Sequence, residues 1–306
     1  MSLPKSDWIW HNGRFIPWEE ATVHVLSHVV NYGTAWFEGL RCYQTPAGPA
    51  LFRLSDHLQR LLNSCRIYRL TDIGFTRQQL EQACLELIRK NGFTSAYLRP
   101  LVLRGLGGMG IGSVNPPEVY LAAWEWGHAL GADSLEQGID VCVSSWRRMA
   151  PDTLPAMAKA AANYMNSQLI KMEALADGYA EGIALDHQGL VSEGSGQNVI
   201  LLRDGKLFTP PISASVLPGI TRDSILRIAA ELGIPVIEQN LPRELLYLAD
   251  ELFLCGTAAE ITPVRSVDRI PIGSGARGPI TTRIQQRFFD LAEGRADDVY
   301  GWRTEV

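Results

Sequence analysis

Lys159 is the residue whose sequence surroundings are most unusual for its type. From Thr153 to Ile170 the segment TLPAMAKAAANYMNSQLI holds one charged residue, this lysine, although the whole chain has only five lysines. An ammonium among apolar and small neighbours loses solvation, which favours the neutral amine, a nucleophile that forms a Schiff base with a carbonyl. On this feature alone, a lysine that extends to the surface is the commoner arrangement. Lys159 is therefore a candidate catalytic residue that needs support from elsewhere in the chain.

Three further segments have residues suited to a flat, anionic ligand. In VSEGSGQN, Glu193 precedes two glycines that allow close approach of the backbone, although a lone turn glutamate is usually solvated. In PGITRD, Ile220 and Thr221 start a predicted helix, where free N–H groups favour a phosphate, and helix capping alone also explains Thr221. CGTAAE follows a predicted strand and offers N–H groups and the hydroxyl of Thr257 to an anion.

Other motifs are weaker. Gly105, Gly107 and Gly110 spell GxGxxG, the pattern of dinucleotide-binding folds, but Pro116 and Pro117 preclude the helix that would hold a pyrophosphate. GxSxG and GxxxxGK[ST] are absent, so a hydrolase elbow and a P-loop are unsupported. The sequence has no HExxH and no third ligand near His24 and His28, so we expect no metal site.

Composition excludes several classes of partner. The net charge is −5 and the basic residues are scattered, so we expect neither nucleic acid nor a membrane as a partner, and we expect small-molecule substrates instead. Apolar stretches are too short to span a bilayer and the N-terminus is too polar for a secretory signal, which predicts a cytoplasmic protein. Five widely spaced cysteines without a CxxC pair predict reduced, mostly buried thiols.

The first half of the chain predicts a sheet covered by helices. WIWHNGRFIPW reads as a hairpin turning at Asn12-Gly13. Ser55 is the expected cap of a helix that runs to about Tyr68, and Thr76 of a second helix that stops at Gly92. Strands are expected over 96–103 and 119–123.

The second half predicts a further set of strands, around 140–143, 182–185, 198–202, 207–209, 235–237 and 251–254. Asp204-Gly205 is a hairpin turn, and helices are expected over 221–232 and 241–248. WEWGHALGADSLEQG lacks periodicity and is interpreted as a connection. We therefore expect a small domain over 1–125, an interdomain loop over 126–136 and a large domain over 137–306.

Taken in order, these segments closely resemble the branched-chain amino acid aminotransferases, pyridoxal phosphate enzymes of the D-alanine-aminotransferase-like class. The resemblance spans about residues 8 to 303. It rests on YGTAWFEGLRCY, HLQRL, AYLRP, the lysine segment, YAEGIALD, SEGSGQN, LPGITRD, YLADELFLCGTAAEITPV and GPITTRIQQRFF. It implies the two-domain fold type IV architecture of mixed α+β and α/β class, with a small α/β N-terminal domain and a larger pseudo-barrel C-terminal domain that binds the cofactor.

The resemblance also implies a complete set of cofactor contacts. Lys159 would hold pyridoxal phosphate as a Schiff base and, once freed by substrate, act as the general base. Glu193 would pair with the pyridine nitrogen, and Tyr164 would hydrogen-bond the phenolic oxygen. The remaining implied cofactor-binding residues, mostly at the phosphate, are Arg60, Leu217, Ile220, Thr221 and Thr257.

Tyr97 and Arg99 lie two apart on a predicted strand and so share a face, which resembles the family's pair of substrate-carboxylate groups. By this analogy Tyr97 meets the α-carboxylate with the Thr257-Ala258 turn, and Arg99 the distal carboxylate of glutamate or 2-oxoglutarate. The other implied substrate-binding residues are Tyr32, Phe37, Gly39, Arg41, Met109 and Trp126. Tyr32 and the Met109 loop would reach across from a neighbouring subunit of a homodimer or a higher homo-oligomer, such as a dimer-based hexamer.

Two positions depart from the family pattern. The tyrosine that usually follows WG is replaced here by His128-Ala129, and Arg104 stands where an apolar residue is usual. Both bear on substrate range. The alternatives left open within the fold are a D-amino acid aminotransferase, an (R)-selective amine transaminase and a lyase of the aminodeoxychorismate type. Outside it remain a nicotinamide oxidoreductase and a cofactor-free binding protein.

Overall fold

The computed structural model describes residues 4–127, 130–131 and 133–306. Contacts divide the chain into two compact units. Unit 1 comprises Met1–Trp126, Ala158–Ala162 and Leu291–Val306, and unit 2 comprises Gly127–Met157 and Asn163–Asp290. The predicted domain boundary over 126–136 stays a prediction.

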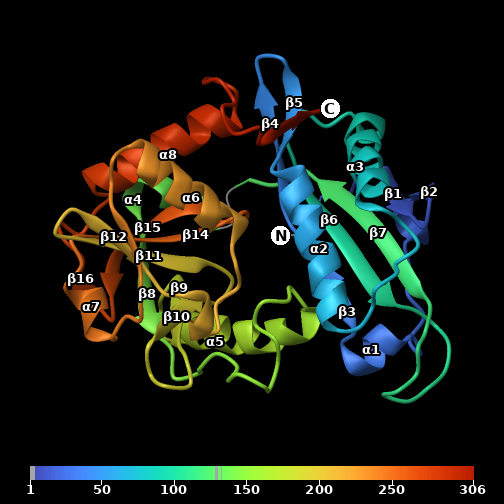
Figure 1. The fold of residues 1–306 in the computed structure, drawn as a ribbon, viewed down its shortest axis with the longest axis horizontal. Helices are drawn as coiled ribbons and strands as arrows, with labels where there is room; N and C mark the ends of the chain where they lie inside the picture. The colour runs from blue at the N-terminus through green and yellow to red at the C-terminus, as the bar shows by residue number, and fades with distance from the viewer. Residues whose placement is uncertain (1–3, 128–129, 132) are drawn as a thin grey trace. The chain divides into compact units, whose positions relative to one another are not determined.

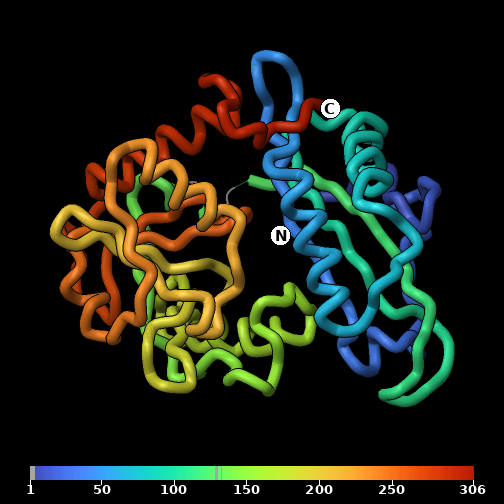
Figure 2. Tube along the Cα trace, in the orientation of Figure 1, coloured from blue at the N-terminus to red at the C-terminus, as the bar shows by residue number. Residues whose placement is uncertain are grey.

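Unit 1 is built on an eight-stranded sheet. Its strands are β1 (Trp8–His11), β2 (Arg14–Pro17), β3 (Ala35–Phe37), β4 (Leu40–Thr45), β5 (Gly48–Phe52), β6 (Ala96–Arg104), β7 (Pro117–Trp124) and β17 (Arg303–Glu305). The order is β17-β5-β4-β6-β7-β1-β2, with β3 also paired to β6. The last strand, β17, is antiparallel to β5, and Figure 2 shows the red end of the chain beside this early hairpin.

The predicted hairpin is confirmed. β1 and β2 pair in antiparallel register, with Trp8 opposite Pro17, and the turn residues Asn12 and Gly13 have φ values of 46° and 92°. Such a turn suits asparagine and glycine because both tolerate positive φ, and it matches the twist of the two strands.

Two helices pack on the unit 1 sheet. α2 (Leu54–Ile67) contacts β3 and β6, and α3 (Arg77–Asn91) contacts β1 and β7. The predicted cap of α3 is confirmed as part of a capping box, with the Thr76 side chain accepting from the Gln79 N–H. The expectation that Ser55 caps α2 is wrong: the N-cap is Arg53 in a left-handed conformation, and Ser55 lies inside the helix.

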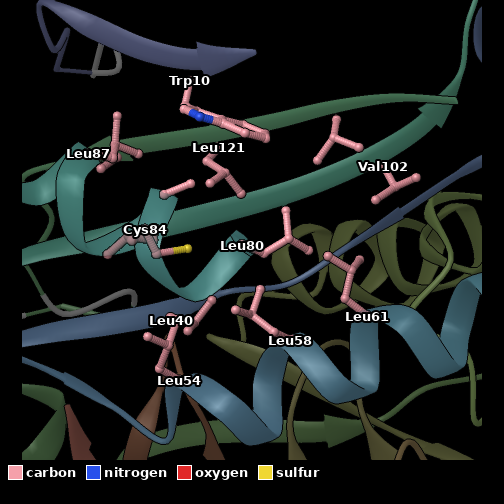
Figure 3. Packing of buried hydrophobic residues seen from close by; sticks show 14 of the residues in the cluster. Trp10, Leu40, Leu54, Leu58, Leu61, Leu80, Cys84, Leu87, Val102 and Leu121 are labelled. Carbon is pink, nitrogen blue, oxygen red and sulfur yellow. The ribbon is translucent and has the colours of Figure 1, made fainter. Parts of the chain in front are cut away.

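The core of unit 1 forms where α2, α3 and the sheet meet. The leucines of α2 and α3 interdigitate with strand residues, as Figure 3 shows for Leu58, Leu61 and Leu80. The apolar residues of both helices face this core, and Leu62 is half-buried at its edge. Ala158 and Ala160 belong to the same core. The two residues that flank Lys159 are therefore anchored in unit 1, and their packing fixes where the lysine backbone lies.

Unit 2 contains a closed barrel. Its strands are β8 (Ile139–Val143), β9 (Glu181–Leu185), β10 (Val191–Gly194), β11 (Asn198–Arg203), β12 (Lys206–Thr209), β13 (Val236–Glu238), β14 (Glu251–Gly256), β15 (Glu260–Val267) and β16 (Ile270–Pro271). The order β10-β9-β8-β15-β14-β11 returns to β10, which closes six strands into a ring. Figure 1 shows these strands with α6 (Ile220–Glu231) beside them.

Four helices of unit 2 differ from the sequence expectations. The predicted helix over 241–248 shrinks to one turn, α7 (Glu244–Tyr247). The segment interpreted as a plain connection contains a short helix, α4 (Ser134–Gln137). α5 (Tyr164–Ala176) and α8 (Pro279–Ala292) were not expected as elements. Periodicity alone was therefore a poor guide to the helices of this unit.

The five cysteines are buried, free thiols, as predicted. Burial raises the pKa of all of them, to about 12 for most and about 11 for Cys142. Within the described ranges, none of the helices combines the length and the apolar character that a membrane-spanning segment requires. The same ranges contain no cluster of three acidic, histidine or cysteine residues that could hold a metal ion.

Candidate active site

Lys159 is held by main-chain bonds on both sides of its side chain. Its N–H donates to Ser64 Oγ at 3.0 Å, and its carbonyl accepts the Phe37 N–H at 3.1 Å. The side chain is half-buried, with Nζ 5.1 Å from the centre of the Phe37 ring. The lysine segment therefore runs alongside β3 and α2, which fix where the amine lies within unit 1.

Arg99 lies over the other aromatic groups of the same region. Its guanidinium carbon is 4.6 Å from the centre of the Phe37 ring and 5.7 Å from that of Tyr97. The predicted common face of Tyr97 and Arg99 is therefore confirmed. Buried Nε of Arg99 has no hydrogen-bond partner among the described residues. Because such a donor is costly to leave unpaired, a ligand carboxylate at this point would relieve the cost.

The Tyr97 side chain leaves room only for glycine at position 39, just before the neighbouring strand β4. A Cβ on Gly39 would lie 1.8 Å from the Tyr97 hydroxyl, so only glycine fits there. The Tyr97 ring packs edge-on against Trp126 at 4.7 Å, and Arg41 Nη1 donates to the Trp126 carbonyl at 3.4 Å. Unit 1 thus brings together most of the predicted substrate residues around the Phe37 ring and Tyr97.

Arg60 forms a buried ion pair that the sequence did not indicate. Its Nε and Nη2 donate to the two oxygens of Glu38 at 2.7 and 2.8 Å, and His57 Nδ1 lies 2.7 Å from the same carboxylate. Burial by itself raises the pKa of Glu38, but the charge of Arg60 and the hydrogen bonds from both partners hold it well below its ordinary value. Burial lowers the pKa of His57.

Two predicted substrate-binding residues of unit 1, Tyr32 and Met109, are exposed at its surface. Tyr32, at the end of α1 (His28–Tyr32), is 37% exposed, and Met109 is 58% exposed. Both are thus accessible to another molecule. Arg104 ends β6, where its Nη1 donates to the Asn115 carbonyl at 3.4 Å. His128 and Ala129 lie outside the described residues.

Glu193 lies in unit 2, and the expectation of a turn glutamate is wrong. The residue is on strand β10, paired with Asn198 of β11, and is only 5% exposed. The burial arises because β10 is part of the closed barrel, whose ring is completed by pairings between distant strands, β8 with β15 and β11 with β14. Glu193 Oε2 accepts the Leu217 N–H at 3.1 Å, so two predicted cofactor residues are in contact.

The predicted phosphate-binding residues Ile220 and Thr221 are the first two of α6, which confirms the helix start. The N-cap is Gly219, and no side chain in the described part of the chain caps the helix. A Cβ on Gly219 would lie 1.9 Å from Asn198 Oδ1, so this position requires glycine. The free N–H groups of the first turn of α6 thus lie beside a turn of small residues, and this arrangement suits a bound anion.

The remaining predicted residues also lie in unit 2. Tyr164 begins α5, and Thr257 and Ala258 follow β14. The CGTAAE and SEGSGQN turns lie close together. A Cβ on Gly256 would lie only 3.5 Å from the Gly196 carbonyl oxygen. The predicted residues are thus divided between the units, with Lys159, Arg60, Tyr97 and Arg99 on unit 1, and the Thr257-Ala258 turn and the rest of the cofactor set on unit 2.

Comparisons with known proteins establish the family. The profile described as Amino-transferase class IV matches residues 35–267, most of the chain. The chain belongs to the class IV aminotransferases. The fold class predicted from the resemblance is confirmed by solved structures that align over nearly the whole chain.

The most similar relatives share one function name. The branched-chain-amino-acid aminotransferase of Escherichia coli (strain K12) is 54% identical over 100% of this chain and 99% of its own length. That of Pseudomonas aeruginosa is 43% identical over 97% of both.

Solved structures agree. The Escherichia coli branched-chain amino acid aminotransferase matches with a TM-score of 0.97 and 54% identity, covering 98% of this chain and 99% of that one. The branched-chain amino acid aminotransferase from Thermobaculum terrenum, solved in its PLP-form, matches with a TM-score of 0.91 and 38% identity, covering 98% of both chains.

Proposed function

We propose that this chain transfers amino groups between branched-chain L-amino acids and 2-oxoglutarate, with pyridoxal phosphate as its cofactor. The observation that carries the proposal is that Lys159 and Arg99 both lie at the Phe37 ring, with Tyr97 beside Arg99, in a chain whose full-length relatives carry that name. The amino donors are leucine, isoleucine and valine, and glutamate is the donor in the reverse direction.

The residues fit pyridoxal phosphate by the chemistry of their donor groups. A phosphate needs N–H donors and a cation, which the start of α6 and Arg60 supply. A protonated pyridine needs a carboxylate, which Glu193 supplies from a buried position. An aldehyde needs an amine, which Lys159 supplies. Tyr164 donates to the phenolic oxygen.

When bound, pyridoxal phosphate supplies the electron sink for the charge left on the substrate when its Cα proton is removed. The Lys159 amine then takes that proton and returns it one carbon away, as a general base and acid. The main chain that carries the amine is held in place, because both its N–H and its carbonyl are hydrogen-bonded within unit 1.

Substrate orientation follows from the same groups. The α-carboxylate binds Tyr97 and the Thr257-Ala258 turn, while Arg99 binds the distal carboxylate of glutamate. Leucine has no such group, and its side chain contacts Phe37 and the other aromatic residues instead. A guanidinium above an aromatic ring accommodates both, since the ring is apolar and its face stabilises the cation when no carboxylate is present.

We also propose that the protein works in the cytoplasm as a homodimer or a higher homo-oligomer. The exposure of Tyr32 and Met109 supports this, because substrate-binding residues at an open surface require another surface to enclose the substrate. Sedimentation analysis of the purified protein would test it, and a monomer active at all concentrations would contradict it.

A half-reaction panel tests the proposed activity. Purified protein should absorb visible light, and its spectrum should change on mixing with L-leucine, L-isoleucine, L-valine or L-glutamate. D-alanine and (R)-1-phenylethylamine serve as controls for the D-amino acid and amine transaminases of the same fold. A colourless protein, or a spectrum that responds to the controls and not to the L-amino acids, would contradict the proposal.

A further inference from the structure

A second arginine of the chain is buried directly against Glu193. Arg148 Nη2 lies 2.7 Å from Glu193 Oε1, and the side chains of Arg148 and Glu193 are only 5% and 7% exposed. The guanidinium is held by a further bond, since Nη1 donates to Asn166 Oδ1 at 3.1 Å, and the main chain of the residue is fixed separately, since its backbone N–H donates to the Leu185 carbonyl at 2.9 Å. The arginine thus has a single, well-defined position behind the carboxylate.

Glu193 itself is held by donors from three separate segments. Besides Arg148, its Oε2 accepts from Asn198 Nδ2 at 3.1 Å and from the Leu217 N–H at 3.1 Å. Asn198 Nδ2 also donates to the Leu217 carbonyl at 3.0 Å, which ties β11 to the segment before α6. All the donors favour the ionised carboxylate, and among these three Arg148 is the only cation.

The charge on Arg148 has a consequence for where a proton resides. A carboxylate and a pyridine nitrogen in contact share one proton, which lies on whichever group is the stronger base in that environment. A buried guanidinium stabilises the ionised carboxylate and so weakens it as a base. The proton then stays on the ring nitrogen, where the electron sink needs it.

We propose that Arg148 is a positioning residue that keeps Glu193 ionised, so that the shared proton stays on the pyridine nitrogen of the cofactor. The inference rests on the proposed function, because it assumes that Glu193 meets that nitrogen. No atom is gained or lost. Without the cation, the proton moves from the nitrogen to the carboxylate, and the contact becomes that of a neutral acid with a neutral pyridine.

The test reads the protonation of the nitrogen itself. The enzyme is loaded with pyridoxal phosphate carrying ¹⁵N in the ring, and the ¹⁵N chemical shift is measured in the wild type and four variants. Arg148→Gln removes the charge and keeps an N–H donor, and Arg148→Met removes both. Arg148→Lys keeps the charge. Arg147→Gln is the matched control, because the neighbouring arginine is exposed and bonds to the His187 carbonyl.

We expect the wild type, Arg148→Lys and Arg147→Gln to show the shift of a protonated ring nitrogen. Arg148→Gln and Arg148→Met should show that of an unprotonated one, and their half-reaction with L-leucine should slow roughly 10- to 100-fold. A wild type that takes up no labelled cofactor would overturn the proposed function. A wild type with a protonated nitrogen, together with a protonated nitrogen in either neutral variant, would overturn the role of Arg148 alone.

Removing a partner from a buried ion pair also destabilises a fold, so a purely structural role must be separated from this one. A structural role predicts lower thermal stability with an unchanged nitrogen signal in the folded fraction. Having two neutral variants protects the test, since Arg148→Gln keeps an N–H donor at position 148, whereas Arg148→Met leaves the Glu193 carboxylate only the donors from Asn198 and the Leu217 N–H.

Discussion

Among the described residues, each unit contains one largely buried arginine–glutamate pair. In unit 1, Arg60 contacts Glu38, and their side chains are 11% and 0% exposed. In unit 2, Arg148 contacts Glu193, and their side chains are 5% and 7% exposed. The residue proposed to bind the cofactor is the arginine in the first pair and the glutamate in the second.

This difference matches the two ends of the proposed cofactor, its phosphate and its pyridine ring. A phosphate is an anion and requires a cation, whereas a protonated pyridine requires an anion. In the proposed arrangement, the second member of each pair, Glu38 or Arg148, holds the charge and orientation of the residue that meets the cofactor. Buried ion pairs contribute little to stability, because desolvation offsets their attraction. Two such pairs are therefore better explained by binding than by folding.

The comparison supposes that one cofactor is attached to Lys159, and replacing this residue has the largest expected effect. Lys159→Ala should leave a folded protein without measurable transamination, because no other lysine lies between buried core residues in this way. The loss of activity is measured as turnover of L-leucine with 2-oxoglutarate, and circular dichroism is the control for folding. Normal turnover would refute the assignment of Lys159.

Removing the anion from the unit 2 pair should affect the chemical step. Glu193→Gln should lower the rate of proton transfer roughly 10²- to 10³-fold for leucine and glutamate alike, since the ring nitrogen loses the charge that holds its proton. Cofactor affinity should change little. Stopped-flow absorbance separates the two quantities, and an unchanged half-reaction rate would show that Glu193 serves only the barrel.

Arg99 should distinguish the two substrates. Arg99→Ala should cost glutamate and 2-oxoglutarate about 2–4 kcal/mol of transition-state stabilisation and leucine far less, since only the first two have a distal carboxylate. The measurement is kcat/KM for each half-reaction. Arg66→Ala, an exposed arginine on α2, is the control. Equal losses for both substrates would refute the role of Arg99.

The sequence singled out Arg60 and Glu193, the members of the two pairs proposed to bind the cofactor, and neither of the residues paired with them. Arg60 and Glu193 lie in motifs with a family resemblance, and Lys159 stands out by its apolar neighbours. Arg148 follows another arginine directly, and the sequence WRR does not indicate which of the two is buried. Glu38 lies in FEGLR beside a glycine, where a charged residue ordinarily suggests exposure.

Local signals also explain which elements were predicted. The first hairpin and the cap of α3 depend on neighbouring residues, and these predictions were confirmed. The burial of Glu193 depends on the closure of a six-stranded ring, which joins residues far apart in the chain. The αL conformation of Arg53, which displaced the predicted cap, likewise has no local signal, because its N–H bonds to the Trp302 carbonyl near the other end of the sequence.

The smallest expected effect on activity comes from Glu38→Gln, the mirror image of Glu193→Gln. Arg60 loses the ionised partner that orients its guanidinium through two bonds, so cofactor affinity should fall about tenfold. Once loaded, the enzyme should turn over at nearly the wild-type rate. Cofactor titration of the apoenzyme measures the affinity, and Glu81→Gln, which removes the acid of a more exposed arginine pair on α3, is the control.

The stability of the protein at acidic pH provides an independent check on the role of Glu38. Its pKa in the folded state is held below the ordinary value of 4.5, so the ionised carboxylate stabilises the fold above that pH, and this contribution is lost as the pH falls. At neutral pH the free energy of unfolding of Glu38→Gln should therefore lie below that of the wild type, by about 3 kcal/mol for a broken buried pair. The gap should narrow on acidification below pH 4.5. A gap that stays constant, or a variant that loses rate and keeps its cofactor affinity, would mean that the two pairs do not have the mirrored roles assigned to them.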